Sequence, residues 1–245
     1  MKSETHAPPV NGVIILDKPP GITSRQAVDR VKRIFGVRKA GHGGTLDPDA
    51  TGVLIVLLGR ATKLFQYLIE GDKEYIGTIT LGVETDTQDA SGKVIRQSEV
   101  NVTEEQIREV VSRFIGEIVQ IPPMYSAIRV GGKRLYKLAR SGREIERPPR
   151  KVTIYELEIL RIDPPEIDFR VVCSKGTYIR TLASDIGREL GCGGHLSGLR
   201  RTRSGPFTLE MALPLDLIES YPQIAHENLL SMEDVIEILR RGYAG

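Results

Sequence analysis

The sequence contains few cysteines, no tryptophan and no long apolar segment. Its 245 residues include two cysteines, Cys173 and Cys192, too few for the disulfide framework of a small secreted protein. No apolar run approaches the roughly 20 residues that cross a bilayer. The first residues, MKSETHAPPVNG, contain no apolar stretch of the kind found in a secretory signal. We therefore expect a cytoplasmic protein that does not span a membrane.

Motifs for cofactors and metals are also missing. The glycine-rich run GHGGTLDPDATG, residues 41–52, has neither the GxxxxGK[ST] nor the GxGxxG spacing of a phosphate-binding loop. Cys192 and His195 lie three residues apart like half of a zinc site, but no second pair follows at the required spacing. We therefore predict that the protein binds no metal and uses no small-molecule cofactor.

Positive charge is concentrated in one part of the chain. Residues 129–151 contain nine basic and two acidic side chains, a net charge of +7, so the rest of a chain whose total is +2 carries −5. A second cluster comprises Arg200, Arg201 and Arg203. One basic run is usually a solvated face, but two in an otherwise acidic chain favour a polyanion partner, with nucleic acid first.

The apolar pattern predicts strands and helices in an irregular order. Residues 121–150 show little periodicity and are rich in Pro, Gly and basic residues, which indicates a long excursion that is either functional or disordered. Without a regular βαβ repeat, the mixture indicates an α+β fold. We predict strands at 13–16, 53–58, 73–81, 152–162 and 167–173, and helices from Thr23 or Ser24 to Phe35, at 61–68, from Thr103, from about Thr177 and at 232–241.

The run GHGGTLDPDATG holds one carboxylate in a tightly bent backbone. Asp47 is followed by Pro48, and the apolar strand from Val53 anchors the loop. Such an arrangement fits a simple turn best, because Asp-Pro commonly starts one, and a rigid catalytic loop or a phosphate cradle are the alternatives. The residues alone leave these three interpretations open.

Five segments in series resemble the motifs of the TruB family of tRNA pseudouridine synthases. The run from Gly41 to Leu54 resembles the active-site motif of that family. The resemblance covers residues 11 to about 218, most of the chain. The other four segments are DKPPGITS at 17–24, DKEY at 72–75, CSKGTYIRTL at 173–182 and GCGGHLSGLRR at 191–201.

The resemblance implies a fold and a reaction. The fold is the pseudouridine synthase fold, with a mixed, mostly antiparallel central sheet flanked by helices and loops and an inserted basic thumb at about 121–150. The reaction is isomerisation of uridine 55 in the T loop of tRNA, by flipping the base, breaking its glycosidic bond and rejoining it through carbon. None of these three steps needs a redox or nucleotide cofactor.

The resemblance also assigns roles to single residues. Asp47 is implied to be the essential carboxylate, as nucleophile or as base, with Arg180 as its counter-ion. Tyr75 is implied to stack on the flipped uracil and to act in the later proton removal. RNA or substrate contacts are implied for His42, which fills the space that the flipped base leaves, for Tyr178 and Leu199 in the pocket, for Asp89, and for the thumb residues Lys133, Arg134, Arg140 and Arg143.

Domain limits and rival functions complete the expectation. We predict a catalytic domain at 11–218 and a tail at 219–245 that is a remnant or the start of a C-terminal PUA domain, in a monomer whose partner is the T stem-loop of tRNA. One rival is a guide-RNA-dependent enzyme that modifies rRNA, since such relatives share the aspartate motif. Another is an RNA chaperone that folds tRNA without needing catalysis.

Overall fold

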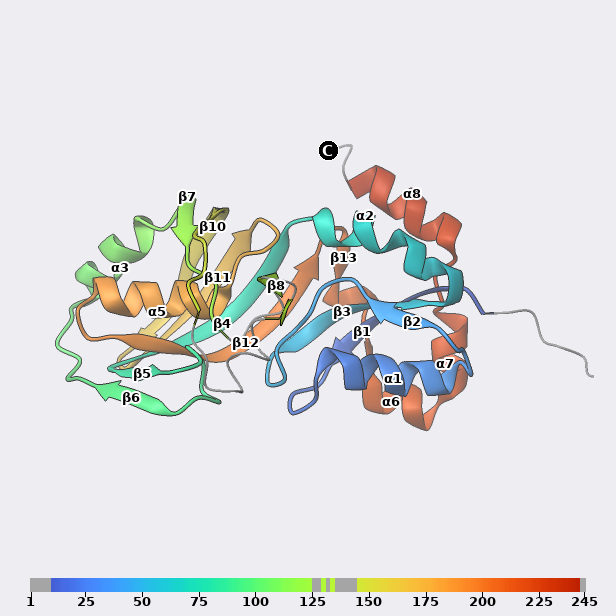
Figure 1. Ribbon diagram of the computed structural model, residues 1–245, viewed down its shortest axis with the longest axis horizontal. Coiled ribbons are helices and arrows are strands. Elements are labelled where there is room, and N and C mark those ends of the chain that lie inside the picture. The colour runs from blue at the N-terminus through green and yellow to red at the C-terminus, as the bar shows by residue number, and fades with distance from the viewer. Residues whose placement is uncertain (1–9, 125–128, 131–132, 135–144, 243–245) are drawn as a thin grey trace, which may run out of the picture. The chain divides into compact units, whose positions relative to one another are not determined.

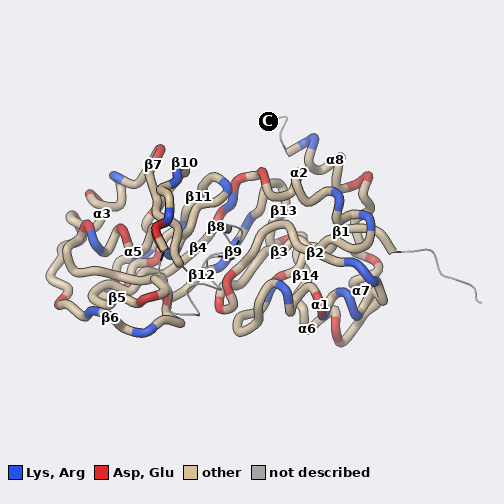
Figure 2. Tube along the Cα trace, viewed as in Figure 1, with Lys and Arg blue, Asp and Glu red and all other residues tan. Residues whose placement is uncertain are grey.

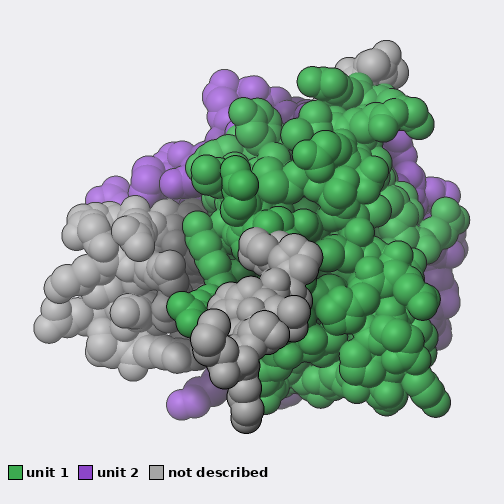
Figure 3. All heavy atoms as spheres, turned by 90° about the vertical axis from the view of Figure 1, so that its right-hand side faces the viewer, with its two compact units in different colours: residues 1–73, 200–245 green, residues 74–199 purple. Residues whose placement is uncertain are grey.

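The computed structural model describes residues 10–124, 129–130, 133–134 and 145–242. Its contacts divide the chain into two units, coloured separately in Figure 3. Unit 1 comprises residues 1–73 and 200–245, and unit 2 comprises residues 74–199. Two strands, β4 (Lys73–Leu81) and β12 (Gly194–Ser204), contribute residues to both.

The sheet of unit 1 is built around two buried strands. β1 (Gly12–Lys18) pairs antiparallel along its whole length with β3 (Thr51–Leu58), and almost every residue of both is buried. β3 also pairs antiparallel with β2 (Ala40–His42) and parallel with the end of β12. Uniform burial explains why these strands are apolar throughout rather than alternating. The sheet is completed by β13 (Phe207–Thr208) beside β12 and β14 (Leu213–Pro214) beside β1.

Helix α1 (Ser24–Ile34) of unit 1 begins at a capping box. The Thr23 hydroxyl accepts from the backbone N–H of Gln26, and the Gln26 side chain accepts from the backbone N–H of Thr23, which satisfies two of the unpaired donors at the helix start. One face, formed by Ser24, Ala27, Val28 and Val31, is buried. Thr23, and not Ser24, is therefore the cap, and the serine hydroxyl is available for another contact.

The C-terminal segment completes the core of unit 1. Its helices are α6 (Leu215–Ser220), α7 (Pro222–Glu227) and α8 (Met232–Gly242). Val235 and Leu239 of α8 pack with Val13 and Ile15 of β1, while Arg30 of α1 forms a two-pronged ion pair with Glu219 of α6. The remaining unit 1 elements are the 3₁₀ helices η1 (Gly59–Leu64) and η2 (Leu209–Met211) and helix α2 (Phe65–Glu70), so the helix predicted at 61–68 is split between two kinds of helix.

The sheet of unit 2 has the order β12, β4, β11, β10, β7. β10 (Arg150–Asp163) and β11 (Glu166–Cys173) form the predicted antiparallel pair, and β10 also pairs antiparallel with β7 (Gly116–Gln120). α3 (Glu104–Ser112), with its predicted capping box at Thr103, and α5 (Ile179–Glu189) complete the unit (Figure 1). Two small antiparallel pairs are formed by β5 (Val83–Thr85) with β6 (Val94–Gln97), and by β8 (Arg129–Val130) with β9 (Lys133–Arg134).

The predicted α+β class, with a mixed and mainly antiparallel sheet, is confirmed. The strand β12 was not predicted, because its sequence, GHLSGLRRTRS, lacks the alternation of a half-buried strand. The predicted domain limits at 218 and 219 stay a prediction, while the structure assigns the helices after residue 218 to unit 1.

Candidate active site

The residues predicted for the site belong to both units, and each group is described within its own unit. Unit 1 contains His42 on β2 and Asp47 in the loop between β2 and β3. Unit 2 contains Tyr75 on β4, Asp89 in the loop between β5 and β6, Tyr178 and Arg180 at the start of α5, and Leu199 on β12.

The loop that bears Asp47 is a turn with a half-buried carboxylate. The backbone carbonyl of Asp47 accepts from the N–H of Ala50 at 3.2 Å. Gly52 closes the loop at a φ of +98°, and a Cβ there would lie 2.2 Å from the backbone oxygen of Arg201, so only glycine fits this crossing. The turn and catalytic interpretations of this segment are therefore compatible, since the turn presents the side chain.

Lys18 of unit 1 binds the backbone of the loop that bears Asp47. Its side chain is fully buried and its Nζ donates to the carbonyl oxygens of Pro19, Ile22 and Pro48 at 2.7, 2.7 and 2.8 Å. Burial lowers the pKa of Lys18 to about 8, against the opposing effect of the nearby Asp49 and Asp47 carboxylates. A packing role is thus favoured over RNA contact for this lysine.

The lowered pKa of Lys18 gives a pH-dependent stability. The folded pKa of about 8 lies below the ordinary 10.5, so between these values the unfolded chain binds more protons and the free energy of unfolding rises with pH, by at most about 1.4 kcal/mol per unit from this group. Below pH 8 the buried cation opposes folding. We expect the free energy of unfolding, measured with urea at pH values from about 8 to 10.5, to rise with pH for wild type. In Lys18→Met this rise is expected to be absent. Exposed Lys39→Met is the control, and parallel curves for wild type and Lys18→Met would contradict the prediction.

Two other unit 1 side chains contact the same loop. The Ser24 hydroxyl donates to the carbonyl of Leu46 at 2.9 Å and accepts from its N–H at 2.8 Å. Arg201, only 1% exposed, donates to the carbonyls of Val53, Gly44 and Thr45. The sequence placed Arg201 in a basic cluster for a polyanion, and this interpretation was wrong for Arg201, because its guanidinium is buried against backbone oxygens.

His42 lies on β2, opposite Val56 of β3. Burial, and next the cationic Arg201, lower the pKa of His42 below its ordinary value, partly offset by a backbone contact at Gly44. The lowered pKa favours the uncharged form of the imidazole.

In unit 2 the structure brings Arg180 and Asp89 together. Arg180 is 5% exposed, and its Nη1 lies 3.3 Å from both Asp89 Oδ2 and the carbonyl of Thr87. The other carboxylate oxygen, Oδ1, accepts from the Thr87 hydroxyl at 2.7 Å and from the hydroxyl and N–H of Ser91 at 2.6 and 3.0 Å. Asp89 is thus held by its own loop and in turn orients the arginine.

A residue that the sequence did not single out, Gln120, fixes the start of α5. Its side chain is buried at the end of β7, accepts from the backbone N–H of Tyr178 at 3.0 Å and donates to the carbonyl of Tyr178 at 3.2 Å. Tyr178 is the N-cap of the helix, so this amide holds both backbone groups of the residue at which the helix begins. No sequence pattern marks a glutamine 58 residues away as the partner.

The other predicted residues lie on strands or outside the described part of the chain. Tyr75 is 8% exposed on β4, and Leu199 is half-buried on the neighbouring strand β12. Lys133 and Arg134 form β9, paired with β8. Arg140 and Arg143 lie outside the described residues.

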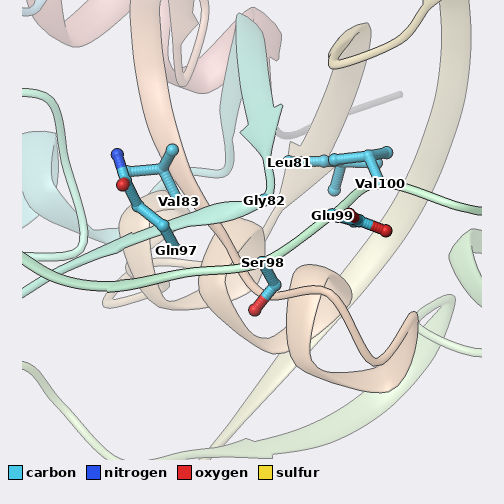
Figure 4. A pocket seen from close by; sticks show the side chains of 7 residues that line it. All are labelled: Leu81, Gly82, Val83, Gln97, Ser98, Glu99 and Val100. Atoms are coloured by element: carbon cyan, nitrogen blue, oxygen red, sulfur yellow. The ribbon is translucent and has the colours of Figure 1, made fainter.

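A pocket of about 440 Å³ lies at another place in unit 2. It is formed by the ends of β4, β5 and β6 and the segment that follows β6 (Figure 4). None of the predicted site residues lines it; the lining residues are Leu81, Gly82, Val83, Gln97, Ser98, Glu99 and Val100. In the part of the chain that the structure describes, no group of three or more His, Cys, Asp or Glu is arranged to hold a metal ion, and none of the helices has the length and apolar character to span a membrane.

Comparison with known proteins identifies relatives over most of the chain. Residues 32–179 match the model of the TruB family pseudouridylate synthase N-terminal domain, and residues 180–240 match that of the tRNA pseudouridylate synthase B C-terminal domain. The protein called tRNA pseudouridine synthase B of Francisella philomiragia is 54% identical over 84% of this chain and 69% of its own length. That of Aromatoleum aromaticum is 51% identical over 93% and 74%.

Solved structures agree with the fold. The chain matches one in a Cbf5-Nop10-Gar1 complex with 37% identity and a TM-score of 0.71, over 93% of this chain and 62% of that one. A chain of an H/ACA RNP bound to a substrate RNA containing 2′-deoxyuridine matches with 35% identity and a TM-score of 0.69, over 93% and 61%. The chain thus spans about three-fifths of these structural relatives.

Proposed function

We propose, because this chain belongs to the TruB family of pseudouridylate synthases, that it isomerises uridine to pseudouridine in tRNA, at position 55 of the T stem-loop. The supporting relatives are about 50% identical over most of the chain and carry the name tRNA pseudouridine synthase B. The pseudouridine synthase fold predicted from the sequence is confirmed by the solved relatives. The two buried free cysteines fit a reducing cytoplasm, where we place the activity.

We propose Asp47 as the catalytic carboxylate. The observation that carries this proposal is the anchorage of its loop: side chains from β1, α1 and β12 bind the backbone on both sides of Asp47. A catalytic group must be held close to its productive geometry by residues whose own positions are fixed. In one route Asp47 attacks C1′ as the N1–C1′ bond breaks, and the Asp47–C1′ bond breaks again when C5 bonds to C1′. In the other route Asp47 removes the 2′ proton as the N1–C1′ bond breaks, and returns it to C2′ when the C1′–C5 bond forms. The C5 proton leaves and N1 regains one, so composition is unchanged.

We propose that the unit 2 residues contact the uracil base and balance the charge of the Asp47 carboxylate. Arg180 as counter-ion to Asp47, Tyr75 as the stacking partner of uracil, and Tyr178 and Leu199 as pocket walls stay proposals for this chain. The contacts of Arg180 and Tyr178 with Asp89 and Gln120 support them, since they fix the first turn of α5. Extrusion of the base from a folded loop costs a few kcal/mol, and His42 is proposed to occupy the vacated space.

Charge supports an RNA partner. Segment 24–39, which includes α1, contains one acidic residue and six basic ones, and Figure 2 shows several as blue segments along the helix. The six are Arg25, Arg30, Lys32, Arg33, Arg38 and Lys39, of which Arg25 and Arg30 form ion pairs with Asp29 and Glu219, so phosphate contacts are proposed for the other four. Phosphate contacts from such residues make RNA affinity fall with salt. The thumb residues Lys133, Arg134, Arg140 and Arg143 stay proposed phosphate contacts.

A guide-dependent enzyme is the second candidate, favoured by the 35–37% identity to a chain in a Cbf5-Nop10-Gar1 complex and to chains in H/ACA complexes. The higher identity to the relatives called tRNA pseudouridine synthase B favours direct action on tRNA. Purified protein mixed with an unmodified tRNA transcript carrying 5-tritiated uridine decides between them. We expect release of about one tritium per tRNA without any guide RNA, and none from a transcript with cytidine at position 55. Activity only after a guide RNA is added would overturn the proposal.

A further inference from the structure

We propose that Ser24 and Arg201 are positioning residues that fix the backbone around Asp47 and so set where its carboxylate lies. This inference rests on the proposed role of Asp47 as the catalytic carboxylate. It concerns residues of unit 1 alone, and neither residue was predicted from the sequence to act on that loop.

Five successive carbonyls of the loop have donors. Those of Gly44 and Thr45 accept from the guanidinium of Arg201, at 3.2 and 3.4 Å. Leu46 is bound by Ser24, Asp47 by the N–H of Ala50, and Pro48 by Lys18. A loop with five successive carbonyls bound in this way has few alternative conformations of similar energy, because a carbonyl that becomes buried without a donor costs about 1–3 kcal/mol.

Ser24 acts on the residue next to Asp47. Its hydroxyl both donates to and accepts from the backbone of Leu46, at 2.9 and 2.8 Å, so it restrains the plane of the peptide groups on both sides of Leu46. The hydroxyl is free to do this because Thr23 caps helix α1. Ser24 is 2% exposed, which excludes direct contact with RNA in this conformation.

Arg201 bridges the two ends of the loop, at Gly44–Thr45 and at Val53, which we call its neck. Its Nε donates to the carbonyl of Val53 on the outgoing strand at 2.8 Å, while Nη1 and Nη2 donate to Thr45 and Gly44 on the incoming side. The planar guanidinium can bridge both sides at once, whereas a lysine ammonium is a single point of contact. At 1% exposure, Arg201 acts on the loop and not on a phosphate.

The sharpest test is Ser24→Ala, with Ser204→Ala as matched control. Ser204 is also a fully buried serine of unit 1, but its hydroxyl has no partner among the described residues. Rates are measured in single turnovers with enzyme in saturating excess over tRNA, well below the melting temperature. We expect Ser24→Ala to lower the rate constant about 10- to 100-fold, as expected for a small displacement of a reacting group, with Kd for tRNA unchanged within about twofold. Ser204→Ala is expected to match wild type.

This design separates positioning from stability. With saturating enzyme, a merely destabilised variant has fewer active molecules but keeps the wild-type rate constant, whereas a displaced carboxylate lowers the rate constant itself. A Ser24→Ala rate constant equal to that of wild type would overturn the role of Ser24.

Two Arg201 variants test the bridge independently. Arg201→Met is expected to lower the same rate constant about 100-fold, and Arg201→Lys to restore only part of it because one ammonium cannot bind both sides of the neck. Full recovery by lysine would show that charge alone matters and would overturn the bridge.

If Asp47→Asn is inactive while the Ser24 and Arg201 variants keep wild-type rate constants, the positioning inference fails and the proposed function stands. If Asp47→Asn stays active, the proposed role of Asp47 fails first.

Discussion

Asp47→Asn is expected to abolish pseudouridine formation while leaving tRNA binding unchanged. Asparagine has nearly the same shape and keeps the Asp-Pro turn geometry, but its amide cannot act as a nucleophile or take up a proton. The loss should reach at least about 10⁴-fold in rate, as found when the essential group of a catalytic set is removed. Tritium release from 5-tritiated uridine measures the rate, and filter binding of the same transcript measures the Kd, which is expected within about threefold of wild type.

Asp49→Asn is the matched control for this prediction. Asp49 lies two residues further along the same loop and is exposed, so the same substitution there tests for general damage to the loop. We expect Asp49→Asn to keep the rate within about threefold. Continued tritium release by Asp47→Asn would remove Asp47 from the chemistry and reopen the interpretation of the loop as a simple turn.

Arg180→Met has the second largest expected effect, on both stability and activity. It leaves the Asp89 carboxylate without its cation in a site where the arginine side chain is 6% and the aspartate 19% exposed. Removing one partner of such a pair costs about 3 kcal/mol, which urea unfolding measures. The rate should fall at least about 100-fold, because Arg180 is also proposed as the cation that keeps the catalytic carboxylate ionised.

A double variant separates these two effects. Arg180→Met combined with Asp89→Asn removes both charges, so much of the stability is expected to return, with a coupling energy of about 1–3 kcal/mol. The rate is expected to stay low, since the cation is still missing. Recovery of both stability and rate would limit Arg180 to a structural ion pair. Arg188→Met, at the exposed end of α5 beside Asp185, is the control for the helix.

Elements with local signals were predictable from the sequence. The Thr103 capping box, the uniformly apolar run at 53–58 and the Asp163-Pro164-Pro165 turn between two strands each depend on neighbouring residues, and the structure confirms all three elements. β12 was missed because its pairing with β3 and β4, and not its own pattern, makes it a strand. Propensity is a weak guide for a strand whose partners are far away in the sequence.

The same distinction applies to the candidate site. Asp47, Tyr75 and Arg180 could be named because they stand in motifs that resemble a family. Ser24, Gln120 and Arg201 could not, because their partners are backbone atoms 22, 58 and 148 residues away. A backbone carbonyl has no residue identity, so no sequence pattern records which side chain will bind it. Burial of Arg201 likewise could not be predicted, since arginine is ordinarily an exposed residue.

The bond between Arg201 and Val53 has a consequence for synthesis on the ribosome. The two residues are 148 positions apart, and chains grow at about 5–20 residues per second. The loop bearing Asp47 therefore leaves the ribosome about 7–30 seconds before the guanidinium that closes its neck. During that interval the nascent chain carries the loop with the proposed catalytic carboxylate but lacks the contact that is proposed to position it, so we expect the emerging chain to leave nearby tRNA unmodified.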